Sequence, residues 1–182
     1  RSLWVNYLIN SPFAKEKDHE GKGLGIPVDL SLAFHTDAGT TPGDSIIGTL
    51  AIYSTAADNG KFPDGTSRMA SRDLSDIVQT QIIEDLRQVY NPGWTRRGLW
   101  DRPYHEARRP NVPAMLLELL SHQNLADQKY GLDPEFRFNV SRSVYKGILK
   151  YLAYTENRDY IVQPLPVKNL AIVPLKGKTF RL

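Results

Sequence analysis

Residues 28–39 read Val-Asp-Leu-Ser-Leu-Ala-Phe-His-Thr-Asp-Ala-Gly, an apolar run that stops at His35. A short apolar run bounded by turn residues is typical of a buried strand, so the sequence predicts a strand over 28–34. A second apolar run, over 112–117, stops in the same way at Glu118. Because open α/β sheets place their sites at the carboxyl ends of the strands, His35 and Glu118 are the first candidate functional residues.

Strands and helices alternate along the rest of the chain. Another strand is expected over 46–53, and apolar positions at helical spacing predict a long helix over 67–90. A second long helix is expected to begin at Pro134, directly after the N-capping residue Asp133. This alternation predicts an α/β protein with a layered architecture.

The composition is that of an ordinary globular protein. The chain has 182 residues and a net charge of +3, with 23 Lys and Arg against 20 Asp and Glu, which is too small and dispersed a charge to indicate nucleic-acid binding. Because the chain has no cysteine, disulfides, cysteine-ligated zinc and thiol catalysis are excluded. No apolar run approaches the roughly 20 residues of a transmembrane helix, so no transmembrane segment is expected.

The character of the sequence changes after residue 155. Pro164 and Pro166 are incompatible with a central strand, so this region is interpreted as a linker. We expect one domain over residues 1–155. Residues 156–182 are expected to hold the linker and, at 169–173, a possible first strand of a following domain.

His35 and Glu118 are residue types suited to metal-assisted hydrolysis. A hydrolytic zinc site needs imidazole or carboxylate ligands, an open position for water and a carboxylate that takes the proton of this water. Without cysteine, any metal site must use carboxylates and the 4 histidines. The spacing alone favours a plainer interpretation, in which His35 caps a strand and Glu118 is a solvated carboxylate.

A basic and aromatic segment precedes the second apolar run. Arg108 and Arg109 lie in a predicted loop and could bind an anionic group of a substrate, because arginine pairs well with carboxylates. The alternative is a solvated loop. Trp94, Trp100 and Tyr104 flank this loop and suit either stacking on sugar rings or packing inside the protein.

Four segments, over residues 29–39, 48–53, 67–70 and 113–124, together and in this order resemble the zinc-dependent N-acetylmuramoyl-L-alanine amidases of amidase family 3. Residues 29–39 are similar to the Asp…His-x-Asn-Ala segment of that family, in which the aspartate lies six residues before the histidine. Gly48-Thr-Leu-Ala-Ile-Tyr53 resembles its Gly-x-x-x-x-Tyr strand, and Ser67-Arg-Met-Ala70 resembles the start of its next helix. Residues 113–124 resemble its Pro-x-Val-Leu-Val-Glu segment, with an asparagine six residues after the glutamate.

The resemblance implies a fold, a site and a substrate. The implied fold is a three-layer α/β fold of the zinc amidohydrolase type, with a mixed or mostly parallel central sheet and helices on both faces. His35 would be a ligand of Zn²⁺ and Glu118 the catalytic carboxylate. The implied substrate is the amide between N-acetylmuramic acid and L-alanine in peptidoglycan, or a related cell-wall polysaccharide. The implied location is secreted, periplasmic or on the cell surface.

The chain departs from the family pattern in several places. The family's other two zinc ligands, a histidine in a Gly-His-Gly-type turn and a glutamate, are expected upstream of Arg1 together with the first strand. Asp37 stands where the family has asparagine, and Leu120-Ser121 stands where it has Gly-Phe. The N-terminal part of the domain is therefore expected to be missing from the given chain.

The His-Thr-Asp-Ala variant also resembles secreted Bacteroidetes-type proteins that are often labelled xanthan lyases. Those proteins join an amidase-like domain to a fibronectin-like domain, and the linker after residue 155 fits this arrangement. The residue pattern of a polysaccharide lyase is not visible, so lyase activity would belong to another part of such a protein. The main alternative to a zinc amidohydrolase is a non-catalytic module of the same fold that binds the cell wall or a carbohydrate.

Overall fold

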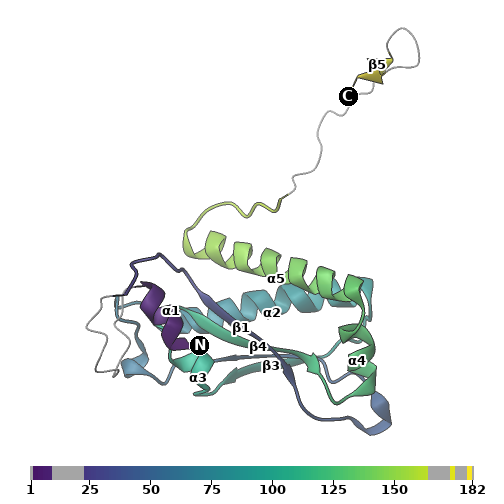
Figure 1. The fold of residues 1–182 in the computed structure, drawn as a ribbon, viewed down its shortest axis with the longest axis horizontal. Helices are drawn as coiled ribbons and strands as arrows, with labels where there is room; N and C mark the ends of the chain where they lie inside the picture. The colour runs from purple at the N-terminus through teal and green to yellow at the C-terminus, as the bar shows by residue number, and fades with distance from the viewer. Residues whose placement is uncertain (1, 10–22, 164–172, 175–179, 182) are drawn as a thin grey trace.

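The computed structural model describes residues 2–9, 23–163, 173–174 and 180–181 (Figure 1). A four-stranded sheet forms the centre, with the strands in the order β1 (Ser31–Asp37), β4 (Ala114–Ser121), β2 (Thr49–Tyr53) and β3 (Arg96–Asp101). β1 is parallel to β4, β2 is parallel to β3, and β2 is antiparallel to β4. The predicted α/β fold with a mixed sheet is therefore confirmed.

Two long helices cover one face of this sheet. α2 (Met69–Val89) lies on β2, β3 and β4, and α5 (Pro134–Thr155) packs along α2 (Figure 1). Side chains of both helices and of the sheet form the main core, and its buried members are Ala51, Leu74, Val78, Ile82, Ile83, Leu86, Trp94, Met115, Leu117, Leu119, Leu120, Phe136, Val140 and Tyr151. The predicted start of α5 is confirmed, because the side chain of Asp133 accepts a hydrogen bond from the backbone N–H of Glu135.

Short helices lie on the opposite face. α3 (His105–Arg108) contacts β4 and β2, and α1 (Ser2–Ile9) lies beside α3. A small apolar cluster of Leu50, Ile52 and Leu116 is buried on this side of the sheet. Helices therefore lie on both faces, as the family resemblance implied.

β1 differs from the expected buried strand. It begins at Ser31 rather than Val28, and the side chain of Phe34 is 51% exposed. Within the described residues β1 pairs only with β4, so its outer edge lies at the edge of the sheet. An apolar run predicts a strand, but it does not indicate whether the strand has neighbours on both of its edges.

Between residues 23 and 163, the strand β3 and the α-helices α3 and α4 (Leu125–Gly131) were not predicted. The sequence of β3 has no regular alternation of polar and apolar residues, and its register shifts relative to β2 near Gly98, where φ is 98°. α3 occupies the segment that was interpreted as a loop before the second apolar run.

α5 ends at Thr155, the position at which the sequence predicted the end of the first domain. β5 (Val173–Pro174) and β6 (Phe180–Arg181) form an antiparallel pair further along the chain. Most of the predicted linker and of the predicted strand over 169–173 lies outside the described residues, so the division into two domains stays a prediction. In the described part of the chain, no helix combines the length and the apolar character that crossing a bilayer requires.

Gly147 sets the distance between α2 and α5. A Cβ atom at this position would lie 2.8 Å from the Cα atom of Val78, so the two backbones are in contact. Gly147→Ala is expected to lower the free energy of unfolding by roughly 1 kcal/mol, because overpacking costs about 1–3 kcal/mol and the gain in helix propensity offsets about 1 kcal/mol. Urea denaturation measures this change.

Gly131→Ala, at the end of α4, is the matched control. Its Cβ atom would lie 3.4 Å from the end of the Leu120 side chain, which can move aside. The control is expected to keep the wild-type stability. Equal losses in both variants would contradict a specific packing constraint at Gly147.

Candidate active site

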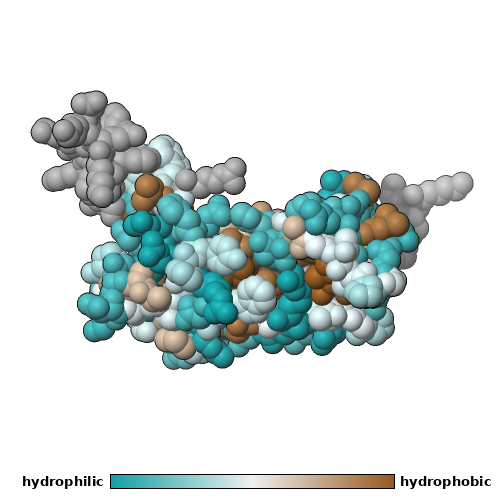
Figure 2. Space-filling view, turned by 90° about the horizontal axis from the view of Figure 1, so that it is seen from below, coloured by the Kyte–Doolittle hydropathy of each residue, from teal (hydrophilic) through white to brown (hydrophobic). Residues whose placement is uncertain are grey.

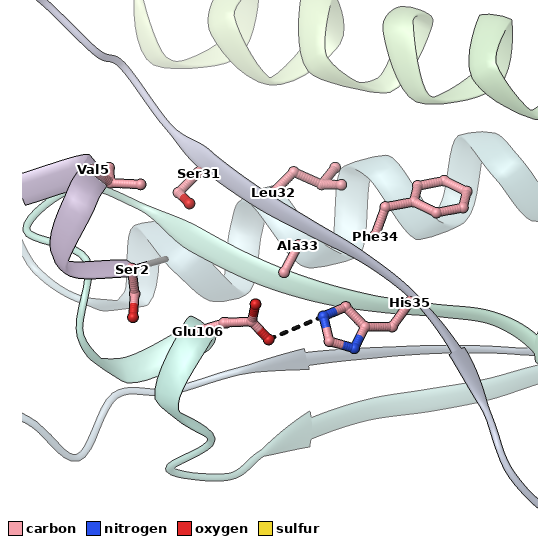
Figure 3. A pocket seen from close by; sticks show the side chains of 8 residues that line it. All are labelled: Ser2, Val5, Ser31, Leu32, Ala33, Phe34, His35 and Glu106. Carbon is pink, nitrogen blue, oxygen red and sulfur yellow. Dashed lines mark ion pairs between the residues drawn. The ribbon is translucent and has the colours of Figure 1, made fainter. Parts of the chain in front are cut away.

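The pairing of β1 with β4 brings the two predicted functional residues together. His35 is the register partner of Glu118, and paired residues of neighbouring strands point to the same face. Figure 3 shows His35 and Phe34 on opposite sides of β1. Both candidates lie inside their strands rather than at the ends, since β1 continues to Asp37 and β4 to Ser121. The fold thus places His35 and Glu118 side by side on the face opposite α2.

His35 is held by a carboxylate from α3. Its Nε2 atom lies 2.9 Å from Oε2 of Glu106, and the two side chains are 32% and 23% exposed. They point toward one another in a pocket of about 270 Å³ that runs along β1 and is also lined by Ser2 and Val5 of α1 (Figure 3). No role is predicted for Glu106 from the sequence, because nothing in the local pattern indicates that α3 folds back onto β1.

Two contacts fix α3 in place. Arg68 is 1% exposed, and its Nη1 atom donates a hydrogen bond of 3.1 Å to the backbone oxygen of Arg108. His105 lies 2.6 Å from the hydroxyl of Ser2, measured from Nδ1 to Oγ. A helix of 4 residues is not stable alone. These contacts therefore hold Glu106 in front of His35.

An ion pair lies on the other side of Glu118. Nη1 of Arg97 donates to Oδ2 of Asp37 at 2.6 Å, and the guanidinium carbon lies 5.9 Å from the ring centre of Trp100. Asp37 occupies the position at which the resemblance predicts asparagine, so the additional negative charge has a cation beside it. This contact joins β3 to the end of β1, and no role for Arg97 was predicted from the sequence.

Glu118 lies among these charges. Its Oε2 atom is buried and has no hydrogen-bond partner in the described part of the chain. Burial is the main reason that the pKa of Glu118 lies above the ordinary glutamate value, and the negative charge of Asp37 raises the pKa further. Positive charge on His35, Arg97 and His122 acts in the opposite direction. A carboxylate with a raised pKa and an unsatisfied oxygen is suited to take a proton from water.

The other predicted residues have different environments. Arg108 belongs to α3, and its Nε atom is buried without a hydrogen-bond partner among the described residues, whereas Arg109 follows α3 and is exposed. Their role in substrate binding stays a prediction. Trp94 is fully buried in the core, which identifies it as a packing residue. Trp100 and Tyr104 are 42% and 52% exposed and therefore accessible to a ligand.

The site supplies part of a metal-binding set. His35 and Glu106 are potential ligands in direct contact, but the described residues contain no group of three His, Asp or Glu side chains that could hold a metal ion. Hydrolytic zinc has three protein ligands and a bound water. The described donors therefore do not complete a zinc site.

The fold and the site define an α/β protein with a glutamate–histidine centre on one face of a mixed sheet. The sequence also identifies the protein family, which is a narrower class. The chain belongs to the N-acetylmuramoyl-L-alanine amidase family, whose model matches residues 25–150 and thus more than half of the sequence. None of the curated proteins is similar enough in sequence to be matched with this chain.

Solved structures of amidases share the fold. An N-acetylmuramoyl-L-alanine amidase from Clostridium difficile 630 has 19% identity and a TM-score of 0.54, over 68% of this chain and 57% of that chain. The CwlD amidase from Clostridioides difficile, solved in complex with the GerS lipoprotein, has 20% identity and a TM-score of 0.53, over 69% and 55% of the two chains. Ami1 from Mycobacterium smegmatis has 19% identity and a TM-score of 0.51, over 69% and 54%. This chain thus spans little more than half of their length.

The raised pKa of Glu118 predicts a pH-dependent loss of stability. The folded protein binds this proton more tightly than the unfolded chain does, so stability falls as the pH rises from about 4.3 through the raised pKa. Glu118→Gln removes the ionisable group. In metal-free buffer, this variant is expected to have a higher Tm than the wild type at pH 7, and the gain should disappear below about pH 3.5, where the carboxyl is protonated in both states.

Glu84→Gln changes an exposed glutamate of α2 in the same way and serves as the control for this series of thermal melts. No pH-dependent gain is expected from it. A gain in Glu118→Gln of equal size at both pH values would exclude ionisation of Glu118 as the cause.

Proposed function

We propose that the chain is part of a hydrolase that cleaves the amide between N-acetylmuramic acid and L-alanine in peptidoglycan. The observation that carries the proposal is the Glu118 carboxylate, which is partly buried and lies beside His35 on an accessible face. One of its oxygens has no hydrogen-bond partner among the described residues. Membership of the amidase family supports this class of reaction.

Glu118 acts as the general base in this proposal. A water molecule between Glu118 and the scissile carbonyl loses a proton to the carboxylate as its oxygen attacks the carbonyl carbon. The same proton then passes from Glu118 to the nitrogen of the departing L-alanine as the C–N bond breaks. A pKa above the ordinary glutamate value suits both transfers, because the group must accept and release a proton at one pH.

We further propose that the chain shares the zinc dependence of its family and that His35 is one ligand. Zinc, when bound, polarises the scissile carbonyl and lowers the pKa of the attacking water. Glu106 would either bind the metal or orient the imidazole of His35 through Nε2, as carboxylates often do in zinc sites. At least one more ligand is needed, and the described residues do not supply it.

Further parts of the proposal concern the surroundings of the site. Arg108 and Arg109 would contact anionic groups of the substrate from the side of α3. A cell-wall substrate, or a related polysaccharide, implies a secreted, periplasmic or cell-surface protein. A fibronectin-like domain after residue 155 is retained as a prediction. None of the site residues supports the xanthan lyase label as an activity.

A non-catalytic module that binds the cell wall or a carbohydrate is the second candidate. One observation favours it, namely that only two potential metal ligands meet in the part of the chain that the structure describes. Measurements of amide cleavage and of bound metal distinguish the two candidate functions.

Glu118→Gln is expected to lower the rate of amide cleavage by about 10²- to 10⁴-fold, which is the usual contribution of a general base. Binding of muropeptides and of zinc should stay close to wild type, because the amide side chain keeps the size of the carboxylate. Mass spectrometry of digested peptidoglycan measures the released peptides. Glu84→Gln is the activity control, and undiminished cleavage by Glu118→Gln would remove Glu118 from the catalytic role.

His35→Ala is expected to lower the zinc content of the purified protein from about one ion per chain, because a zinc site with three protein ligands loses one of them. Elemental analysis beside an intact-mass measurement gives this ratio. His122→Ala is the control, since His122 is exposed and contacts Thr36. Unchanged zinc in His35→Ala would remove His35 from the metal site, and a wild-type protein that takes up no zinc would favour the binding module.

A further inference from the structure

β3 contains a bulge that changes which side chains reach the face of Glu118. Between two paired positions, β3 has one residue more than β2, and the register shifts near Gly98, whose φ is 98°. Side chains alternate along a regular strand, so Arg96 and Trp100 would otherwise point to the same face. The bulge reverses the alternation and places Trp100 on the face of Arg97, an effect that bulges commonly have beside functional sites.

The strand pairing places Trp100 relative to Glu118. Trp100 is the register partner of Ile52, and Ile52 is the partner of Leu116, so all three side chains share the face of Glu118. Neighbouring strands are about 4.8 Å apart, so the strand of Trp100 lies about 10 Å from the strand of Glu118. The cluster of Leu50, Ile52 and Leu116, on the two strands β2 and β4, is buried. Trp100 and Glu118 thus lie on the same face of the sheet, two strands apart.

Arg97 presents open N–H groups toward the same region. Asp37 accepts a hydrogen bond from Nη1, and in the part of the chain that the structure describes neither Nε nor Nη2 donates to another residue. The carboxylate of Asp37 balances the charge of Arg97, while Glu118 places a further acidic group nearby. The open N–H groups therefore suit a neutral acceptor, such as the carbonyl oxygen of an amide, better than a second anion.

Trp100 offers a partly exposed aromatic ring beside these donors. Its side chain is 42% exposed, and the Arg97 guanidinium carbon lies 5.9 Å from its ring centre. Figure 2 shows that the side of the molecule seen from below is largely hydrophilic, with hydrophobic residues in small separate areas. That side lacks the broad apolar patch that is typical of a protein interface, so a polar ligand with one apolar ring face is the better fit to an isolated indole.

We propose that Arg97 and Trp100 form a subsite for an N-acetylated sugar ring. The ring stacks on the indole of Trp100, and Arg97 donates a hydrogen bond to the carbonyl oxygen of the acetamido group. The subsite rests on the proposed function, because it assigns the glycan part of the same substrate. The N-acetyl state of the sugar then decides how tightly the substrate binds.

Two muramyl dipeptides that differ only in the acetyl group test the subsite. One carries the N-acetyl group on the sugar and the other has a free 2-amino group. Isothermal titration is carried out on the whole chain with Glu118→Gln, so that hydrolysis does not interfere. We expect about tenfold tighter binding of the acetylated probe, which corresponds to about 1.4 kcal/mol.

Two substitutions separate the two contacts. Arg97→Met is expected to abolish the preference for the acetylated probe, and Trp100→Ala to weaken both probes about equally. Arg96→Met is the matched control, because Arg96 lies on the same strand and pairs with Asp76 on the opposite face. Trp4→Ala removes another exposed tryptophan and should not change either affinity. An unchanged preference in Arg97→Met, or wild-type affinities in Trp100→Ala, would overturn the subsite.

Gly98→Ala tests the bulge while Arg97 and Trp100 are kept. Its φ of 98° is a conformation that alanine rarely adopts, although no atom would lie within 4 Å of the new Cβ. The variant is therefore expected to lose the acetyl preference. Gly65→Ala carries the same kind of strain in a loop, with φ at 89° and open space around the Cβ, and is expected to keep the preference. Circular dichroism verifies the fold of each variant.

Hydrolysis, measured separately with Glu118 intact, distinguishes failure of the subsite from failure of the proposed function. Acetyl-dependent binding without cleavage by the zinc-supplemented protein would contradict the amidase proposal and support the subsite. Cleavage of the acetylated substrate at an unchanged kcat/KM in both Arg97→Met and Trp100→Ala would support the amidase proposal and overturn the subsite.

Discussion

The parallel pairing of β1 with β4 is the interaction on which the site depends. Side chains of a strand alternate between the two faces, so a slip of one residue would turn His35 away from Glu118 and into the side covered by α2. β4 is anchored on both faces by buried apolar residues, with Leu116 on one side and Leu117 on the other. The apolar residues of the central strand therefore fix the position of a polar pair.

The residues around Glu118 come from β1, β3 and α3. α3 supplies the carboxylate that contacts His35, and β3 supplies the cation that contacts Asp37. His35 and Asp37 thus each have a charged partner, whereas the buried Oε2 atom of Glu118 has no hydrogen-bond partner in the part of the chain that the structure describes. Unsatisfied buried polar atoms are uncommon in proteins and are typical of functional groups that await a ligand. The neighbours of Glu118 are thus held in place by their own contacts, and the carboxylate of Glu118 is left to interact with a ligand.

The local pattern of polar and apolar residues was sufficient to predict much of this fold. For the site, it predicted only His35 and Glu118. The two long helices and their termini follow from periodicity and from the Asp133 cap, and the apolar runs led to His35 and Glu118. Glu106 and Arg97 were missed because their positions depend on long-range contacts. Glu106 reaches His35 only because buried Arg68 holds α3, and Arg97 faces the site on a strand whose bulge hides its pattern. Likewise, whether β1 is central or at the edge is a property of the whole sheet.

The outer edge of β1 has a consequence for handling the protein in solution. Among the described residues no strand covers this edge, and Phe34 lies half exposed beside it. Free backbone N–H and C=O groups in a row, next to an exposed aromatic ring, are a template on which another extended chain can dock. As the concentration rises, the β1 edges of two copies of the described chain would pair with each other. Pairing at this edge would bury the pocket along β1 that is lined by His35.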